Sequence, residues 1–539
     1  MENVKQYKFP MIIAIVQWYC TTVLQVDKLF FDYDFQLDTV LYRFVKLLYL
    51  LVLILAWCYG FYIYRMQKIS LIYKRYITLF SIYFSITLLL LLFLWPGTWA
   101  WDDLGVIEEH LLYYNWDPWQ HILTSIFQLV CLQFLPFPGG IILIQNIIIS
   151  ICVAFCIVKI EQTCNIYLTH YKWLDIIFKL TPFLLPPILM YQFSGYRIGL
   201  YVYLELTMLC ILVCSYKDST KWSVAYTSLF VFLCAIVSTW RTESLCYIPV
   251  VCIALAFFKN ILSTSKKVGV IFFIILSFNC INYFQNNAVG NNNYKIVSTL
   301  RPLAELIKVS DPVQDAKSLA AIDKVINLEI IYNNPHANGE ELYWEFQVVR
   351  NEYSEEDYSN YLDAFLALAI KYPKTVLFER FLLFLCSTGL LGQDRMVTNV
   401  DASAHLYWPA EAGSRADIFQ NIGWVANSPI FPKLRESMIY FLGMRTASGK
   451  SLPLYGLIWN AFIPFLYLLV AWIKLLIKKQ WLLWVIVSSV IIKVPLIFMT
   501  QPANWFMYWL SICLIGYVYF IFECIALCNK KMEGGKNNA

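Results

Sequence analysis

Long apolar runs recur along this chain and constrain its fold more than any other feature. A helix needs about 20 consecutive apolar residues to cross the hydrocarbon core of a bilayer. Runs that meet or approach this length lie at 9–25, 45–64, 76–95, 119–137, 139–158, 176–192, 198–215, 222–240, 244–258, 268–284, 453–473, 481–499 and 505–526. Of the 539 residues, 60% are hydrophobic and only 14% are charged, whereas soluble domains contain about 25% charged residues. The sequence therefore predicts an all-α polytopic membrane protein with about 11–13 membrane helices.

Charge and cysteine content argue against several other classes of protein. The net charge of +5 is small and spread along the chain, so we expect no nucleic-acid partner. Most of the 16 cysteines lie inside apolar runs, and no two have the spacing CxxC. They are better interpreted as small hydrophobic residues of membrane helices than as zinc ligands or disulfides.

Clusters of lysine and arginine orient the helices, because cytoplasmic loops are enriched in these residues. Four clusters predict the cytoplasmic side: Arg65, Lys68, Lys74 and Arg75; Lys259, Lys266 and Lys267; Lys474, Lys478 and Lys479; Lys530 and Lys531. Asp102 and Asp103 then face outward. An odd number of crossings must separate them from the basic segment 217–221, yet four apolar runs lie between. We expect 176–192 not to cross, because three prolines interrupt it.

The same orientation divides the chain into five parts. We expect N-terminal membrane segments and a basic cytoplasmic loop at 1–75, a membrane core at 76–284 with a first outer loop at 96–118, an extracytoplasmic domain at 285–452, C-terminal membrane helices at 453–526 and a cytoplasmic tail at 527–539. Apolar residues at helical spacing in 303–326 and 358–372 predict that the extracytoplasmic domain is mainly helical. The stretch 376–391 contains Glu379 and Arg380 and is predicted to lie as a helix in the membrane interface.

Two adjacent carboxylates, Asp102 and Asp103, stand where a membrane helix emerges into water. Charged groups at this depth are costly unless they have a function. Such a pair is suited to deprotonate a hydroxyl nucleophile as a general base, or to hold a divalent cation such as Mg²⁺ or Mn²⁺. The alternative is a solvated pair that marks the end of the helix.

Two arginines supply positive charge on the same predicted side. Arg197 and Arg241 stand at the outer ends of helices, and the guanidinium fork matches the oxygens of a phosphate group. The alternative is that each anchors its helix by extending toward the interface. Tryptophans crowd the predicted outer loops, either as a platform for sugar or as an interfacial aromatic belt.

Two short motifs surround the carboxylates. The first is Trp95-Pro96-Gly97-Thr98-Trp99-Ala100-Trp101-Asp102-Asp103 and the second is Asn115-Trp116-Asp117-Pro118-Trp119-Gln120-His121. Together they resemble the first outer loop of the GT-C class of membrane glycosyltransferases, and most closely a poorly characterised bacterial group of integral membrane proteins. Asp102 matches the aspartate of that group, whereas Trp116-Asp117-Pro118 replaces its Trp-His-Pro element. Weaker similarities extend the resemblance from about residue 76 to about residue 510.

The resemblance implies a GT-C-like bundle that transfers a sugar from a polyprenyl-phosphate-linked donor to an extracytoplasmic acceptor, which would be a cell-envelope glycan, a lipid or a protein. It implies a site on the outer face of a bacterial plasma membrane, with membrane lipid as a further partner. The expected roles are general base or metal ligand for Asp102 and Asp103, binding of the lipid phosphate for Arg241 and Arg197, and substrate contact for Trp116, Asp117, His121 and Glu243.

Two other functions remain open from the sequence. A transporter of lipid-linked oligosaccharides should show repeat symmetry and charges near mid-membrane, and only Glu205 and Lys493 are strong candidates for such charges. A polymerase or ligase of envelope polysaccharide uses the same lipid carrier, but its main outer loop comes late in the chain and is centred on arginine. The early loop with Asp102 favours the glycosyltransferase.

Overall fold

The computed structural model describes residues 7–24, 38–66, 71–111, 113, 115–135, 137–168, 172–218, 220–258, 261–289, 296–392, 395–404 and 428–536. Within these ranges every regular element is a helix, and β-pairing is limited to isolated bridges. The chain divides into two units. The first contains Met1–Gly290, Asn399–Leu452 and Tyr517–Ala539, and the second contains Asn291–Thr398 and Pro453–Gly516.

Apolar helices long enough to cross a membrane run through both units. Within the described ranges eight qualify: Phe44–Tyr62, Ile72–Leu94, Pro138–Cys164, Arg197–Lys217, Thr264–Val289, Tyr455–Ile477, Trp481–Thr500 and Phe506–Asn529. The bent pair Trp173–Leu184 and Pro186–Gln192 raises the number to nine if it forms one span. These helices confirm the prediction of an all-α polytopic membrane protein. The predicted 11–13 also counted shorter runs such as Val224–Trp240.

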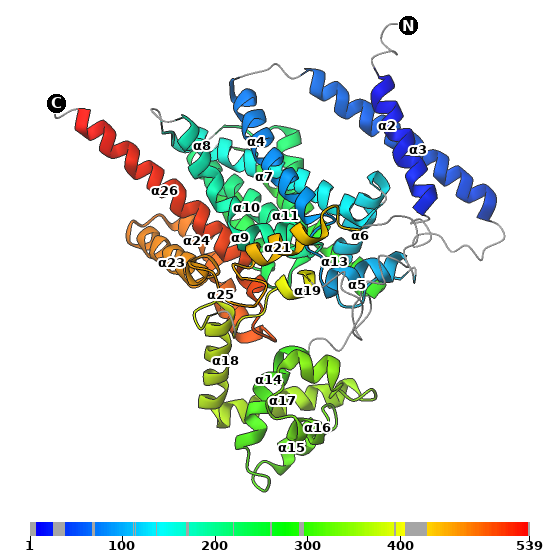
Figure 1. Ribbon diagram of the computed structural model, residues 1–539, viewed down its shortest axis with the longest axis vertical. Coiled ribbons are helices and arrows are strands. Elements are labelled where there is room, and N and C mark those ends of the chain that lie inside the picture. Colours follow the sequence, from blue (N-terminus) through cyan, green and yellow to red (C-terminus); the bar gives the residue numbers. More distant parts are fainter. Residues whose placement is uncertain are drawn as a thin grey trace. The chain divides into compact units, whose positions relative to one another are not determined.

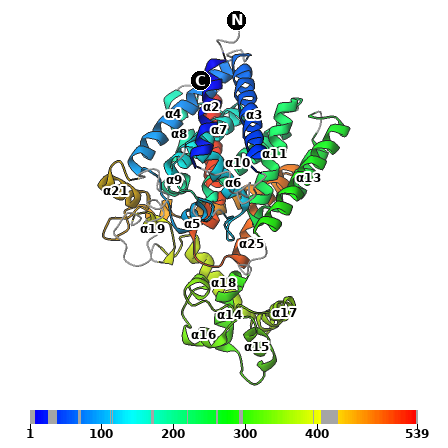
Figure 2. The ribbon, with the colours of Figure 1, turned by 90° about the vertical axis from the view of Figure 1, so that its right-hand side faces the viewer.

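The centre of the first unit is formed by α4, α7 and α10, which pack side by side (Figure 1). α11 packs against both α10 and α13, and α2 packs against α3 and α6 (Figure 2). The helices of this unit are α2 (Lys8–Leu24), α3 (Asp38–Met66), α4 (Leu71–Leu94), α5 (Trp101–Leu111), α6 (Ile122–Phe134), α7 (Pro138–Cys164), α8 (Lys172–Leu180), η2 (Thr181–Leu184), α9 (Pro186–Gln192), α10 (Arg197–Lys217), α11 (Val224–Trp240), η3 (Thr242–Ser244), α12 (Tyr247–Phe257), α13 (Thr264–Val289), α19 (Val400–Ala404), α21 (Pro432–Leu442) and most of α26 (Leu510–Lys536).

Four charged side chains meet at one end of this bundle, and we call them the Arg75 cluster. Arg75, near the start of α4, donates to Glu161 of α7 and to Asp175 of α8, both at 2.7 Å. Lys179 of α8 forms ion pairs with the same two carboxylates, also at 2.7 Å. Glu161, Asp175 and Lys179 are buried. Two positive and two negative charges therefore compensate one another inside the protein.

The Arg75 cluster corrects the predicted path of residues 176–192. Asp175 lies beside the start of α4, whereas Phe193 accepts a hydrogen bond at 2.8 Å from Thr98, which follows the end of α4. The two contacts therefore lie toward opposite ends of α4, which has 24 residues and a length of about 36 Å. These contacts argue against the expectation that 176–192 does not cross, because the segment extends from one end of α4 toward the other. Its prolines occupy the first positions of η2 and α9, where a missing N–H is tolerated, so they bend the segment by 64° without reversing it.

The run that fails to cross is instead α6. In the first turn of α6, the hydroxyl of Thr124 accepts a hydrogen bond at 3.0 Å from the indole N–H of Trp240. The backbone carbonyl of Trp240 accepts a hydrogen bond from Arg197 at the start of α10. Beyond its last turn, Phe137 packs against Trp95 with ring centroids 5.8 Å apart. Both ends of α6 therefore lie at the end of the bundle opposite the Arg75 cluster. We call this end the Asp103 end.

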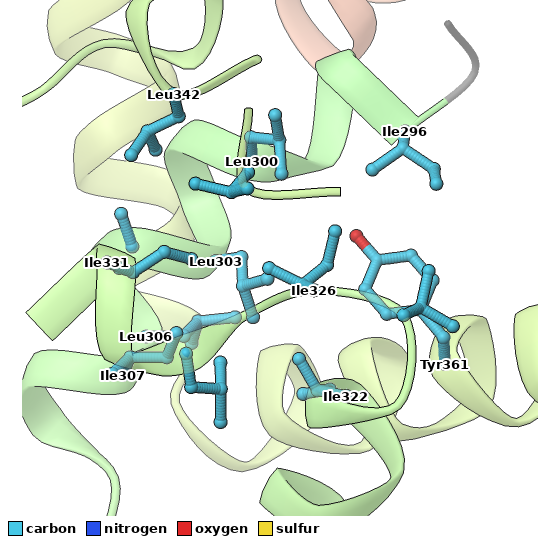
Figure 3. Packing of buried hydrophobic residues seen from close by; sticks show 14 of the residues in the cluster. Ile296, Leu300, Leu303, Leu306, Ile307, Ile322, Ile326, Ile331, Leu342 and Tyr361 are labelled. Atoms are coloured by element: carbon cyan, nitrogen blue, oxygen red, sulfur yellow. The ribbon is translucent and has the colours of Figure 1, made fainter. Parts of the chain in front are cut away.

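The second unit includes a helical module with its own apolar core (Figure 3). Leu300, Leu303 and Leu306 of α14 pack against Ile322 and Ile326. The predicted helical patterns at 303–326 and 358–372 are confirmed. The helices of this unit are α14 (Val297–Val309), α15 (Ala316–Asp323), α16 (Leu328–Asn333), η5 (Glu341–Glu345), α17 (Glu355–Lys371), α18 (Pro373–Ser387), α22 (Tyr455–Ile458), α23 (Phe462–Ile477), α24 (Trp481–Ile491), α25 (Lys493–Thr500) and η8 (Phe506–Trp509).

The two charges that suggested an interfacial helix at 376–391 are turned inward. Glu379 and Arg380 of α18 are buried and form an ion pair at 2.7 Å. Arg380 also donates to the carbonyl of Gln501 at 2.7 Å. Through this bond Arg380 joins α18 to the C-terminal end of α25 in the same unit. The prediction treated 285–452 as one domain, whereas the contact pattern groups Asn399–Leu452 with the first unit.

Several predicted features lie outside the described residues. They are the basic residues Lys68 and Lys259 and the loop tryptophans Trp408 and Trp424.

Candidate functional site

The loop between α4 and α5 carries the predicted carboxylates and is fixed to the end of α9. Thr98 donates through its backbone N–H to the carbonyl of Phe193 at 2.8 Å and through its hydroxyl to Met190 at 2.6 Å. Gly97 has φ +124°, and a Cβ at this position would lie 2.6 Å from the carbonyl oxygen of Phe193. Only glycine satisfies both conditions, which accounts for the Pro-Gly turn in the motif.

Asp103 is the residue that joins this loop to the start of α10. Its Oδ1 accepts a hydrogen bond from the backbone N–H of Ala100 at 2.7 Å. Its Oδ2 accepts from the Ser194 hydroxyl at 3.0 Å and from the Gly195 N–H at 2.9 Å. The side chain is only 2% exposed. Because both oxygens are engaged by neutral donors, Asp103 positions the loop and is poorly placed to contact a substrate.

Burial raises the pKa of Asp103 to about 8, and the negative charge of Asp102 acts in the same direction. The donors at Ala100, Ser194 and Gly195 act against this shift, because hydrogen bonds to a carboxylate favour its ionised form. Asp103 therefore differs from the buried carboxylates of the Arg75 cluster, each of which contacts a lysine and an arginine.

A second set of contacts holds the same loop, from residues far along the chain. The Ser403 hydroxyl lies 3.0 Å from the carbonyl oxygens of both Thr98 and Trp99. Arg435 of α21 is buried and donates at 2.9 Å to the carbonyls of Gly97 and Ser403. Sequence reasoning missed Ser403 and Arg435, because a side chain that binds backbone carbonyls leaves no spacing pattern in the sequence.

Asp102 is exposed, in contrast to its neighbour. Burial raises the pKa of the Tyr196 phenol well above its usual value, and the charges of Asp102 and Asp103 add to the shift. The carboxylate of Asp102 therefore lies close to Tyr196, which directly precedes Arg197 at the start of α10. Of the two predicted catalytic carboxylates, only Asp102 is accessible to a molecule at the Asp103 end.

Arg197 and His121 come together at this end. Burial lowers the pKa of His121 to about 3, and the charge of Arg197 contributes to the shift. The imidazole is therefore neutral near pH 7. Its Nδ1 accepts a hydrogen bond from the Leu123 N–H at 3.3 Å, so the proton is assigned to Nε2. This Nε2 is buried and has no hydrogen-bond partner within the described ranges, which leaves a donor available to a ligand oxygen.

Arg241 and Glu243, predicted as separate contacts, form an ion pair with each other. Arg241 is buried and its guanidinium lies 5.9 Å from the ring centre of Tyr201. Tyr201 in turn contacts the Ser244 hydroxyl. Glu205, predicted as a mid-membrane charge, accepts a hydrogen bond from Tyr247. The charge of Arg241 is thus partly compensated by Glu243.

Asp117 and Trp116 have a more local environment. Asp117 is buried, and its Oδ1 accepts hydrogen bonds from the N–H groups of Trp119 at 2.6 Å and Gln120 at 2.9 Å. It therefore shapes the turn that leads into α6. Trp116 is half-buried in the same turn. The substrate contact predicted for Asp117 stays a prediction.

An apolar groove runs through the first unit and reaches the Asp103 end. It has a volume of about 1140 Å³ and is lined by side chains of α6, α7, α10, α11 and α13 and of the loops next to α11 and α13. Leu123 and Trp240 line it at the Asp103 end, and Trp222 and Lys266 line it elsewhere. Among the described residues that line it there is no aspartate or glutamate.

The predicted metal site does not fit the donors present. Both oxygens of Asp103 already accept hydrogen bonds, so few lone pairs remain for a divalent cation. No group of three or more His, Cys, Asp or Glu side chains suited to a metal ion occurs in the part of the chain that the structure describes.

Comparisons of this chain with family models, with curated proteins and with solved structures give no match.

Proposed function

We propose that the protein is a membrane glycosyltransferase that moves a sugar from a polyprenyl-phosphate-linked donor to a hydroxyl of an acceptor. One observation supports this proposal above all. The apolar groove is lined at one end by Trp240, whose carbonyl accepts a hydrogen bond from Arg197, and by Leu123, whose N–H donates to His121. The Nε2–H of His121 has no partner within the described ranges, and the exposed Asp102 lies close to Tyr196, which precedes Arg197. A lipid chain, a phosphate and a nucleophilic hydroxyl thus each have a suitable neighbour.

The chemistry that follows is a single displacement. The acceptor oxygen forms a bond to the anomeric carbon of the donor sugar, and the bond from that carbon to the phosphate oxygen breaks. The Asp102 carboxylate accepts the proton of the acceptor hydroxyl. Polyprenyl phosphate leaves with the bonding electrons, and Arg197 and His121 donate to its oxygens. Asp103 has no chemical step and holds the loop that carries Asp102.

The test is the substitution Asp102→Asn in the full-length protein. We expect sugar transfer to fall by about 10²–10⁴-fold, the usual contribution of a general base. The measurement is mass spectrometry of lipid-linked glycans and their products in cells that express either protein. Asp102 is exposed, so expression and melting temperature should stay unchanged. Transfer that survives this substitution would contradict the proposal.

A transporter gives a different outcome in the same experiment. It moves a lipid-linked glycan without forming a glycosidic bond, so no new product appears with the unmodified protein. Unchanged product masses combined with a changed distribution of the donor across the membrane would favour transport.

A further inference from the structure

The groove extends much further than a phosphate site requires. α11 lines it from Val224 to Trp240, which are its first and last residues. Its 17 residues correspond to about 25 Å. The hydrocarbon core of a bilayer is about 30 Å thick, so one leaflet accounts for about 15 Å. A groove that follows the whole of α11 therefore passes the middle of the membrane.

The two ends of the groove differ in their polar neighbours. At the end with Trp240, the Arg197 guanidinium lies 3.5 Å from the Trp240 carbonyl oxygen, and His121 stands two residues before Leu123. The other end is fixed by a hydrogen bond of 3.1 Å between the Trp222 N–H and the Ile261 carbonyl. Lys266 lines the groove near that end and is exposed. Both ends thus have a cationic side chain nearby, but only the Trp240 end combines it with a buried donor that has no partner within the described ranges, the Nε2–H of His121. On this ground we place an anionic head group at the Trp240 end, with an apolar chain directed toward Lys266.

The length of the groove narrows the class of lipid. An ordinary phospholipid has two acyl chains that each occupy one leaflet, and neither reaches much beyond about 15 Å. A polyprenyl phosphate has a single chain that can extend further. Each buried methylene group contributes to affinity. A groove longer than one leaflet should therefore bind a longer isoprenoid chain with higher affinity than a shorter one.

One position along the groove has room to be filled. Gly269 of α13 lines the groove, and a Cβ added there would meet no atom within 4 Å. It stands three residues after Lys266 and therefore near the end remote from Arg197. A large side chain at this position would shorten the groove without affecting the phosphate end.

We propose that the groove binds a single isoprenoid phosphate and selects it by chain length, with the absence of a side chain at Gly269 leaving room for the distal isoprene units. This inference rests on the proposed function for its choice of an isoprenoid phosphate. The end of the groove near Gly269 would then determine which chain length binds.

The experiment measures binding rather than transfer. Full-length protein is titrated with undecaprenyl phosphate, geranyl phosphate or dioleoyl phosphatidate, and native mass spectrometry gives the bound fraction. For Gly269→Phe we expect the affinity for undecaprenyl phosphate to fall by about tenfold, which corresponds to the exposure of roughly two methylene groups. The affinity for geranyl phosphate should stay the same. The substitution Arg197→Gln should instead weaken both isoprenoid phosphates to a similar degree.

Two further variants serve as a control and as a substitute. Gly60→Phe is the matched control, because a Cβ at Gly60 of α3 also meets nothing within 4 Å and Gly60 does not line the groove. If Gly269→Phe fails to fold, Ser228→Phe on α11 narrows the same groove.

An unchanged ratio of the two isoprenoid affinities in the groove variants would overturn the inference. So would binding of dioleoyl phosphatidate as tight as that of undecaprenyl phosphate, because the groove would then hold ordinary bilayer lipid. If length selection holds while Asp102→Asn retains transfer, the carrier site stands and the proposed catalytic role fails. The opposite pair of results retains the catalytic role and rejects length selection.

Discussion

The two ends of the first unit bury carboxylates in opposite ways. At one end, Glu161 and Asp175 each contact both Arg75 and Lys179. At the other end, Asp103 is surrounded by a hydroxyl and two backbone N–H groups. Charges are thus compensated by opposite charges at one end, whereas a single carboxyl group is held by neutral donors at the other.

The two ends should therefore respond differently to substitution and to pH. A buried ion cluster is costly to break, because removal of one member leaves the others uncompensated. A carboxylate held by neutral donors can gain or lose a proton while its partners stay in place. The predictions below test whether the two ends differ in this way.

The largest expected effect is at the Arg75 cluster. Lys179→Met should destabilise the protein by about 3–5 kcal/mol, because Glu161 and Asp175 would then share only Arg75. Thermal melting of the purified protein measures the change. Lys371→Met is the matched control, since it removes an ion pair of 2.6 Å whose lysine is 41% exposed. It should cost far less, and a similar loss in both variants would contradict the contrast.

Asp103→Asn should cost about 1–3 kcal/mol of stability. An amide has one oxygen, so its NH₂ group must face the N–H of either Ala100 or Gly195. The same substitution at the exposed Asp102 should change the melting temperature little. Equal losses at both positions would contradict the positioning role of Asp103.

The proton of Asp103 should make stability depend on pH in a specific direction. In the native protein Asp103 keeps its proton up to about pH 8, whereas the unfolded chain releases it near pH 4. Stability should therefore fall as the pH rises from about 4 to about 8, by at most about 1.4 kcal/mol for each pH unit, and then stay level. Melting curves of Asp103→Asn should lack this component, and an identical pH profile in both proteins would argue against the raised pKa.

The smallest expected effect concerns the contacts made from residues 399–452. Ser403→Ala removes the hydroxyl beside the Thr98 and Trp99 carbonyls and should cost about 1 kcal/mol. Ser437→Ala is its control, because that hydroxyl is exposed and bonds only within its own helix. A shift in melting temperature shared by both variants would mean that Ser403 has no special part in holding the loop.

Local sequence signals predicted much of the architecture. Runs of apolar residues indicated the long membrane helices, and helical spacing indicated α14 and α17. The start of α17 also carries a capping box between Ser354 and Asp357, a device that acts within one turn. In each case the deciding interactions involve residues close together in the sequence.

Interactions between distant residues were not predictable in the same way. The failure of α6 to cross depends on where Trp240 and Trp95 contact it, and apolar content alone does not contain that information. Ser403 and Arg435 lie more than 300 positions from the loop that they hold. The division of labour between Asp102 and Asp103 also depends on burial, which two identical neighbours do not reveal in a sequence.

The bonds of Asp103 have a geometric consequence for the two residues proposed to act on substrate. Asp102 directly precedes Asp103 in the chain. The backbone N–H of Gly195 donates to the Asp103 carboxylate, and Arg197 follows Gly195 by two residues. The positions of Asp102 and Arg197 are therefore both set by Asp103. A small displacement of Asp103 would move both residues together, so the distance between them would vary less than the position of either.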